Sequence, residues 1–213
     1  MTEPPRTVLA GGHAAFRAAL AAALDVPVLG VALDELENAR ASLTAARRSV
    51  CWVHLVPSAG EDGGAAEAVA EASLLLQSAA AARALARSAG VPLAFIAVLP
   101  MPGMFAGPGR MACDVALTAM TSLMRAEIGD WSSDGCRIAG LVYAGIEGNE
   151  PPGQRPLEEI RQRTPMGTLG TFAQLAQALR FVASDAATYI TGTLLRVDGG
   201  CDAYSWVYPA RTI

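Results

Sequence analysis

Residues 163–200 decide the fold of this chain, and they read RTPMGTLGTFAQLAQALRFVASDAATYITGTLLRVDGG. A Pro-x-Gly-x-x-Gly stretch opens this segment, and an apolar helical run follows it over residues 172–183. Ser-Asp-x-x-x-Tyr-Ile-Thr-Gly then leads into a short apolar strand over residues 194–197, which ends in Val-Asp-Gly-Gly. A helix that passes through a glycine turn into an apolar strand is typical of the end of an α/β domain.

The rest of the chain alternates strands and helices in the same way. We expect one Rossmann-like, doubly wound α/β domain over residues 1–213, with a parallel sheet and a C-terminal aromatic tail over residues 201–213. Short apolar runs that both faces of such a sheet would cover are the expected strands. These runs are 7–10, 26–31, 50–56, 92–98, 136–142 and 194–197. The expected helices are 13–24, 34–48, 65–87, 112–128 and 172–183, and glycine and proline predict a loop over 99–111.

Composition limits the classes of partner. Hydrophobic residues make up 52% of the 213 residues and charged residues only 17%, which favours subunit contacts over a lone monomer. The alternative is that much of this excess is alanine, which needs no special burial. A net charge of −4 gives no basic face, so we expect no nucleic-acid partner.

Cysteine and histidine content predicts neither disulfides nor a metal site. The four cysteines, at 51, 113, 136 and 201, lack Cys-x-x-Cys spacing, and the runs around Cys51 and Cys136 predict buried thiols. His13 and His54 are the only histidines in the sequence. We see no secretory leader and no apolar stretch long enough to span a membrane, so we expect a cytoplasmic protein.

The C-terminal motifs closely resemble those of the short-chain dehydrogenase/reductase family, and the resemblance extends unevenly from residue 7 to residue 200. It implies a dinucleotide-binding fold whose active members carry a tyrosine and a lysine one helical turn apart. The lysine lowers the pKa of the tyrosine, which exchanges a proton with the substrate hydroxyl. This chain contains no lysine, and all 16 of its basic residues are arginine.

The resemblance also locates the cofactor positions, and most of them are changed. The family's glycine turn follows the first strand, where Gly11 is kept but Ala15 and Arg17 replace later glycines. Between residues 24 and 50 there is room for one strand–helix unit where the family has two, so the N-terminal half is shortened by about one βα unit. Asp34 could bind a ribose, or it could be a helix N-cap. We expect no bound NAD, NADP or other cofactor.

The catalytic positions are changed as well. Aligned through Arg125, Glu127 and Ile128, the family's tyrosine falls at Arg110 and its lysine at Asp114. The helper serine falls near Ala97, within a stretch that holds no serine between residues 88 and 122. An arginine cannot serve as an acid near neutral pH, and an aspartate would repel a tyrosinate. The degenerate catalytic positions are therefore Ala97, Arg110 and Asp114.

Together these features resemble an inactive subunit of a hetero-oligomeric short-chain dehydrogenase. The resemblance implies an active homologue as partner in a heterotetramer, an assembly exemplified by enzymes that act on a hydroxyacyl-CoA thioester. Two other functions stay open: an active NAD(P)-dependent oxidoreductase with a non-standard site, and a ligand-sensing regulatory module. Cys113 with a histidine is a weaker candidate nucleophile set. Met101, Met104 and Met111 could form a substrate lid, a contact surface or a plain loop.

Overall fold

Six parallel strands of the described chain form one sheet in the order β2-β1-β3-β4-β5-β6. The computed structural model describes residues 6–11, 14–24, 28–31, 50–56, 64–104, 108–150 and 154–204. The strands are β1 (Arg6–Gly11), β2 (Val28–Val31), β3 (Val50–Leu55), β4 (Leu93–Pro100), β5 (Arg137–Tyr143) and β6 (Thr193–Val197). The strand order reverses at β1, which has β2 on one side and β3 on the other. This is the doubly wound α/β sheet that the sequence predicted, with a single described strand beyond β1.

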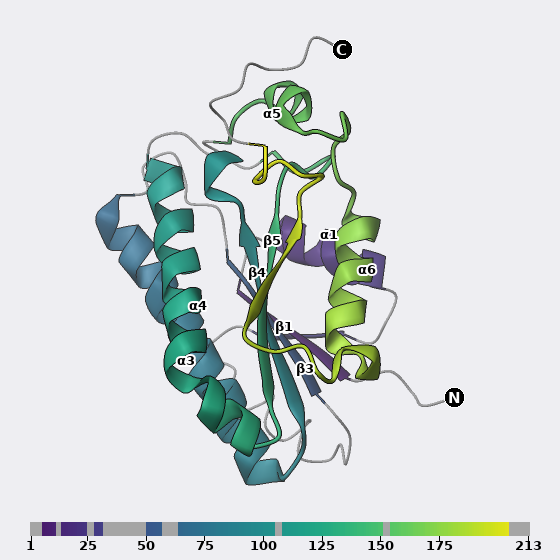
Figure 1. Cartoon of the computed structure of the whole chain (residues 1–213). Helices are drawn as coiled ribbons and strands as arrows, with labels where there is room; N and C mark the ends of the chain where they lie inside the picture. The colour runs from purple at the N-terminus through teal and green to yellow at the C-terminus, as the bar shows by residue number, and fades with distance from the viewer. Residues whose placement is uncertain are drawn as a thin grey trace.

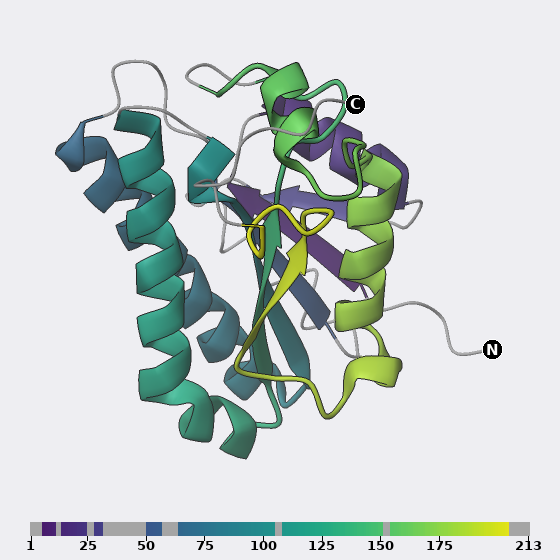
Figure 2. The ribbon, with the colours of Figure 1, turned by 45° about the horizontal axis from the view of Figure 1, so that its top comes forward.

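Helices cover both faces of the sheet, as Figure 1 shows. They are α1 (Ala14–Leu24), α3 (Ala65–Ala89), α4 (Pro108–Ser133), α5 (Leu157–Arg163) and α6 (Phe172–Ala183), with short 3-10 turns η2 (Pro102–Met104) and η3 (Asp185–Ala187). The helices α3 and α4 lie side by side on one face, and α1 and α6 lie together on the other. Figure 2 turns the carboxyl ends of the strands toward the viewer, and α5 lies at that end of the sheet.

The centre of the sheet is buried on both faces. Every residue of β3 and of β4 is buried, which explains why both strands read as continuous apolar runs instead of alternating patterns. Trp52 on β3 faces α3 and donates an indole N–H bond of 2.9 Å to the Ser78 hydroxyl. One strand over, Phe95 on β4 packs against Trp131 of α4, with ring centroids 5.8 Å apart. These two aromatic contacts fix the α3–α4 layer to the sheet.

Side-chain caps fix the position of α6. Thr171 and Gln174 form a reciprocal capping box at its N-terminus. At its other end, Arg137 of β5 donates to the Val182 carbonyl oxygen at 2.9 Å and also to that of Ile190, which follows η3, at 3.3 Å. Arg180 of α6 in turn donates to the last two carbonyl groups of α1. Guanidinium groups therefore satisfy helix C-terminal carbonyls that would otherwise lack partners.

The observed elements confirm most of the sequence predictions and correct three. The helix α4 is longer than expected, because Pro108 is accommodated in the first turn, where its missing N–H costs no hydrogen bond. The strand β4 extends to Pro100 and η2 follows, so much of the predicted loop over 99–111 is ordered structure. The short helix α5 was not predicted. The expected helix over 34–48 and the aromatic tail beyond residue 204 lie outside the described residues.

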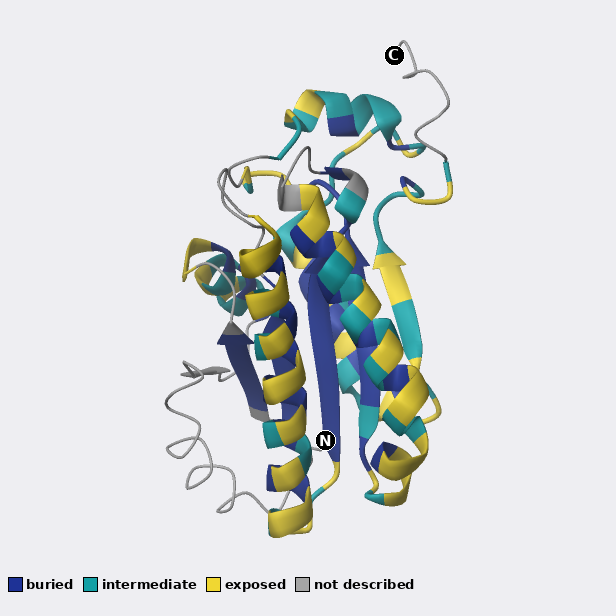
Figure 3. Ribbon diagram, turned by 90° about the vertical axis from the view of Figure 1, so that its left-hand side faces the viewer, coloured by how far each residue is buried: buried dark blue, intermediate teal, exposed yellow. Residues whose placement is uncertain are grey.

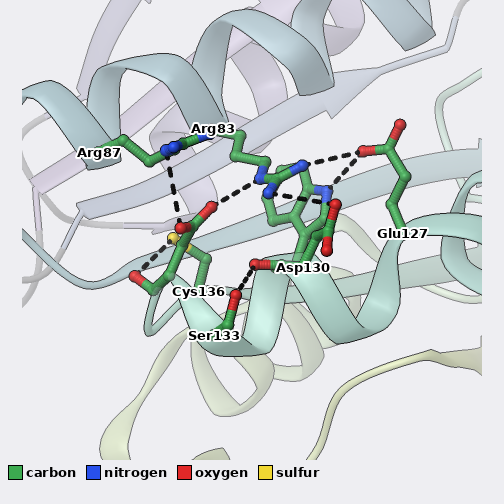
Figure 4. Close-up of polar contacts among 8 residues, drawn as sticks. Arg83, Arg87, Glu127, Asp130, Ser133 and Cys136 are labelled. Carbon is green, nitrogen blue, oxygen red and sulfur yellow. Dashed lines mark hydrogen bonds and ion pairs between the residues drawn. The ribbon is translucent and has the colours of Figure 1, made fainter.

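A cluster of charges joins the carboxyl-terminal halves of α3 and α4 (Figure 4). Arg83 of α3 lies 2.7 Å from a carboxylate oxygen of Asp134, 3.5 Å from Glu127 and 3.6 Å from Asp130. The Arg83 side chain is only 18% exposed, so solvent screens these interactions incompletely. Without Arg83, three carboxylates would lie close together with little opposing charge.

We expect Arg83→Met to lower the free energy of unfolding by about 1–2 kcal/mol, since a charge-assisted bond is lost and a carboxylate cluster is left unpaired. The matched control is Arg87→Met, whose exposed side chain makes one ion pair of 3.6 Å with Asp134 and should change stability by less than about 0.5 kcal/mol. Urea unfolding at low and at high salt measures both variants. Equal effects of the two substitutions would contradict a central role for Arg83.

Candidate functional site

The carboxyl edge of the sheet, where β1, β3, β4 and β5 end, is the place where this class of fold binds ligands. Gly11 ends β1, and α1 begins at Ala14. Ala15 is exposed and Arg17 is half-buried, so neither side chain lies in the core. His13 lies outside the described residues, as does Asp34. The first turn of α1 thus lies at the expected ligand position, with Ala15 and Arg17, which the sequence predicted to replace family glycines, on its outer side.

Phe16, between these two residues, points inward. Its ring stacks on that of Tyr143, the last residue of β5, with centroids 5.2 Å apart and an interplanar angle of 25°. It also meets Phe172, the first residue of α6, edge-on at 5.2 Å. Three rings from α1, β5 and α6 therefore interlock at the carboxyl edge. The sequence did not predict this group, although Phe16, an aromatic residue just after the glycine turn, was a visible signal.

The three predicted catalytic positions do not converge in the structure. Arg110 and Asp114 lie on the solvent side of α4, with side chains 65% and 52% exposed, and they pair with each other at 3.5 Å. Ala97 is fully buried in β4, where its partners across the sheet are His54 and Gly140. The assignment of these positions to the family's serine, tyrosine and lysine stays a prediction, but in this arrangement they form no common site.

Cys113 and Tyr143 are the titratable groups that face each other near the carboxyl edge. Burial, with a smaller contribution from the neighbouring Asp114 carboxylate, raises the pKa of Cys113 to about 12. Burial also raises the pKa of Tyr143 well above its usual value, and the nearby Cys113 thiol adds to this. Leu117, four residues after Cys113, packs against the core. Both Cys113 and Tyr143 are therefore protonated at neutral pH, as expected of packing residues.

His54 is a buried imidazole without a hydrogen-bond partner. It lies on β3, two residues after Trp52, and so faces α3 and α4. Only 1% of its surface is exposed, and neither ring nitrogen has a partner among the described residues. Burial lowers its pKa to about 4, so the ring is neutral at physiological pH. Neither ring nitrogen of His54 hydrogen-bonds to Cys113, so these two residues do not form the base–nucleophile pair that such chemistry needs.

The methionines of the expected lid occupy different environments. Met101 and Met104 are buried in the main core, while Met111 lies on α4 and is 45% exposed. The Met101 N–H donates to the Tyr143 carbonyl at 2.8 Å, and the Arg155 N–H donates to the Met104 carbonyl at the same distance. The structure thus corrects the lid interpretation for Met101 and Met104, whose side chains fill space at the carboxyl edge.

The C-terminal signature has a structural role. Gly199 has a φ of +60°, and a Cβ atom there would lie 2.6 Å from Cγ2 of Thr164, so a larger residue would strain both segments. The Asp198 carboxylate accepts backbone N–H bonds from Gly200 and Asp202, each 2.9 Å long. Met166 donates its N–H to the Gly199 carbonyl at 3.2 Å. This turn therefore holds the segment before α6 against the end of β6.

Metal and membrane functions find no support in the part of the chain that is described. Among those residues no group of three or more His, Cys, Asp or Glu side chains could hold a metal ion. None of the described helices is both long and apolar enough to cross a membrane.

Sequence comparison identifies relatives over the C-terminal two thirds of the chain. Residues 68–202 match the family profile described as enoyl-(acyl carrier protein) reductase. A galactitol 2-dehydrogenase (L-tagatose-forming) of Cereibacter sphaeroides is 38% identical over 86 residues, 38% of this chain and 34% of that protein. A 2-(S)-hydroxypropyl-CoM dehydrogenase of Xanthobacter autotrophicus is 31% identical over 139 residues, 62% of this chain and 53% of that protein. These matches thus span from a third to about half of the relatives' lengths.

Solved structures share the fold over nearly the whole chain. A short-chain type dehydrogenase/reductase from Mycobacterium ulcerans superposes with a TM-score of 0.73 at 16% identity, covering 96% of this chain and 92% of that one. A short-chain dehydrogenase from Bacillus anthracis gives a TM-score of 0.68 at 19% identity, covering 96% and 88%. At these identities the likeness concerns the fold alone.

We expect His54 to make the fold sensitive to acid. Its pKa of about 4 in the folded chain lies below its ordinary value of 6.5, so between these values the unfolded state binds a proton that the folded state does not. The resulting destabilisation is absent above pH 6.5, grows as pH falls and is complete below pH 4, where it reaches about 3 kcal/mol. His54→Leu should flatten this part of the pH profile of urea unfolding. Parallel profiles for the two proteins would contradict the prediction.

The four cysteines should be unreactive in the folded protein. All are buried and free, and burial raises the pKa to about 12 for Cys51 and Cys113 and to about 11 for Cys201. Because the thiolate is the reactive form, a disulfide reagent such as DTNB should label the native chain very slowly and all four thiols in urea. Fast labelling of Cys113 in the native chain would instead favour the nucleophile hypothesis.

Proposed function

Because the chain belongs to the short-chain dehydrogenase/reductase family, we propose that it is a non-catalytic, structural subunit of a hetero-oligomeric short-chain dehydrogenase. One observation carries this proposal: the sequence has no lysine, so the family's tyrosine–lysine pair cannot be formed anywhere in the chain. Arginine cannot replace that lysine simply as a cation, because its planar guanidinium has a different geometry and hydrogen-bonding pattern from a compact ammonium.

The proposal does not depend on one alignment of α4. If the tyrosine position is Cys113, which faces inward, then the lysine position is Leu117 and the serine position shifts to Pro100 at the end of β4. If it is Arg110, the corresponding residues are Asp114 and Ala97. Neither set contains a hydroxyl acid or an ammonium group. Both alignments therefore predict an inactive site.

The packing of the carboxyl edge supports the absence of a cofactor. Several side chains in this region are part of the main hydrophobic core, and a ligand seated among them would have to displace them. They are Phe16, Met101, Met104, Cys113, Tyr143, Ile146 and Ile160, each at most 8% exposed. Opening this region would expose apolar surface at a cost of about 25 cal/mol for each Å². We propose that the chain binds neither NAD nor NADP.

Two apolar surfaces are suited to subunit contacts. The outer helix face, on α3 and α4, carries Val69, Leu76 and Met111, which are 62%, 40% and 45% exposed. Figure 3 shows the solvent-facing sides of these two long helices. The edge patch, near the end of α6 and on the edge strand β6, carries Phe181, Tyr189 and Leu195, which are 45%, 102% and 37% exposed. Exposed apolar side chains at both places favour protein contacts there.

The small residues 79–82 of α3 would permit close approach of a partner helix, but only part of this run faces outward. Ala79 and Ala82 are fully buried within the fold, whereas Ala80 is exposed. A charge at Ala79 or Ala82 would disrupt the core of the subunit itself and could not report on assembly. Leu76, seven residues after Val69, is a suitable position for testing the outer helix face.

The proposed partner is an active short-chain dehydrogenase in a heterotetramer, with a hydroxyacyl-CoA thioester as one substrate class for such an assembly. The names of the relatives, all dehydrogenases among those described above, favour a second candidate, an active NAD(P)-dependent oxidoreductase with a non-standard site. Turnover by the isolated chain that is lost in Asp114→Ala would support this second candidate.

Recovery of the chain from its native source should yield a complex with an active short-chain dehydrogenase. Within that complex, we expect Leu76→Glu to cause dissociation and lower the thermal stability of the partner, because an interface would bury an uncompensated charge. Size-exclusion chromatography and the melting temperature of the partner measure this.

The control is the double variant Arg110→Ala/Asp114→Ala, which removes the exposed ion pair of α4 and should leave partner activity almost unchanged. A greater loss in this double variant than in Leu76→Glu would show that the predicted catalytic positions matter more than the outer helix face. A pure homo-oligomer without a dehydrogenase partner would refute the subunit proposal.

A further inference from the structure

The Phe16 ring lies between two other rings at the edge where doubly wound domains bind ligands. Tyr143 stacks on one side at 5.2 Å, and Phe172 meets it edge-on at 5.2 Å. Phe16 belongs to the first turn of α1, directly after β1, and the strand order reverses at β1. The ring is therefore placed by the same topology that would otherwise place a ligand.

We infer that the Phe16 side chain takes the place of a bound planar ring. It completes the packing between Tyr143 and Phe172 that a ligand would otherwise complete. The inference rests on the proposed lack of a cofactor and explains how the carboxyl edge remains packed without one. It specifies which side chain fills this space and what class of molecule could replace it.

Phe95 provides a comparison for Phe16, because both rings are buried but only Phe16 lies at the carboxyl edge. Phe95 is the third residue of β4, away from the carboxyl edge, with 0% of its surface exposed, whereas Phe16 is 8% exposed and lies at the carboxyl end of the sheet. Truncating either ring to alanine should leave an apolar cavity that a small aromatic molecule can enter. Only the space left by Phe16 should open toward solvent, so only that space should accept a ring with a charged tail that must stay hydrated.

The experiment compares Phe16→Ala with Phe95→Ala in the full chain, in whatever assembly it purifies. Two probes are used, neutral indole and indole-3-propionate. Binding is measured by calorimetry and by the shift in melting temperature. We expect both probes to bind Phe16→Ala and to raise its melting temperature by roughly 3–6 °C at about ten times the dissociation constant. Phe95→Ala should bind indole at most, and the wild-type chain should bind neither probe.

Several results would overturn the inference. The first is that Phe95→Ala binds indole-3-propionate as tightly as Phe16→Ala does. The second is that Phe16→Ala does not bind this charged probe. The third is that the wild-type chain binds either probe or NADH. If an alanine variant does not fold, Phe16→Val and Phe95→Val are compared by the same criteria. None of these measurements involves a partner. If the chain proves to be a pure homo-oligomer, the subunit proposal is refuted, but probe binding by the Phe16 variants still tests this inference.

Discussion

The structure depends on one constraint, that a parallel sheet must be covered on both faces. With β3 and β4 buried at every residue, the two faces need helices that are long enough and firmly held. On one face, α3 and α4 extend along the whole sheet and are held by the Trp52–Ser78 hydrogen bond and by the cluster around Arg83. On the other face, α6 is held through Arg137 and itself caps α1 through Arg180.

The exclusive use of arginine suits this architecture and limits its chemistry. A guanidinium has five N–H donors in a fixed plane, so one side chain can bind several carbonyl or carboxylate oxygens, as Arg137 and Arg83 do. The same group stays protonated at any physiological pH. It cannot provide the ammonium that active members of the family place beside their tyrosine. Cation geometry thus favours structural roles over proton transfer in this chain.

The parts of the family pattern that persist are the parts that hold the fold together. Asp198 and Gly199 shape the turn after β6, and the Thr171–Gln174 capping box starts α6. Each contributes to packing or hydrogen bonding and needs no substrate. Near the carboxyl edge, by contrast, Arg110 faces solvent and Phe16 fills the interior, and neither takes part in these contacts. Fold stability and catalysis rest on different residues, so one can be kept while the other is lost.

The sequence by itself determined the order and type of most elements, because hydrophobic runs, glycine turns and caps are local signals. It also determined that no lysine is available, a fact that no arrangement of the chain can change. It did not predict α5, a helix of only seven residues whose one buried side chain, Ile160, packs against the backbone at Gly145 rather than against its own helix.

Only the tertiary structure decided where side chains point. It placed Arg110 and Asp114 on the solvent side of α4 and turned Cys113 inward toward Tyr143. It also brought Phe16, Tyr143 and Phe172 together from three distant segments. The physical reason is that a residue's direction depends on which faces of its helix or strand find partners, and those partners are set by contacts between elements far apart in the chain.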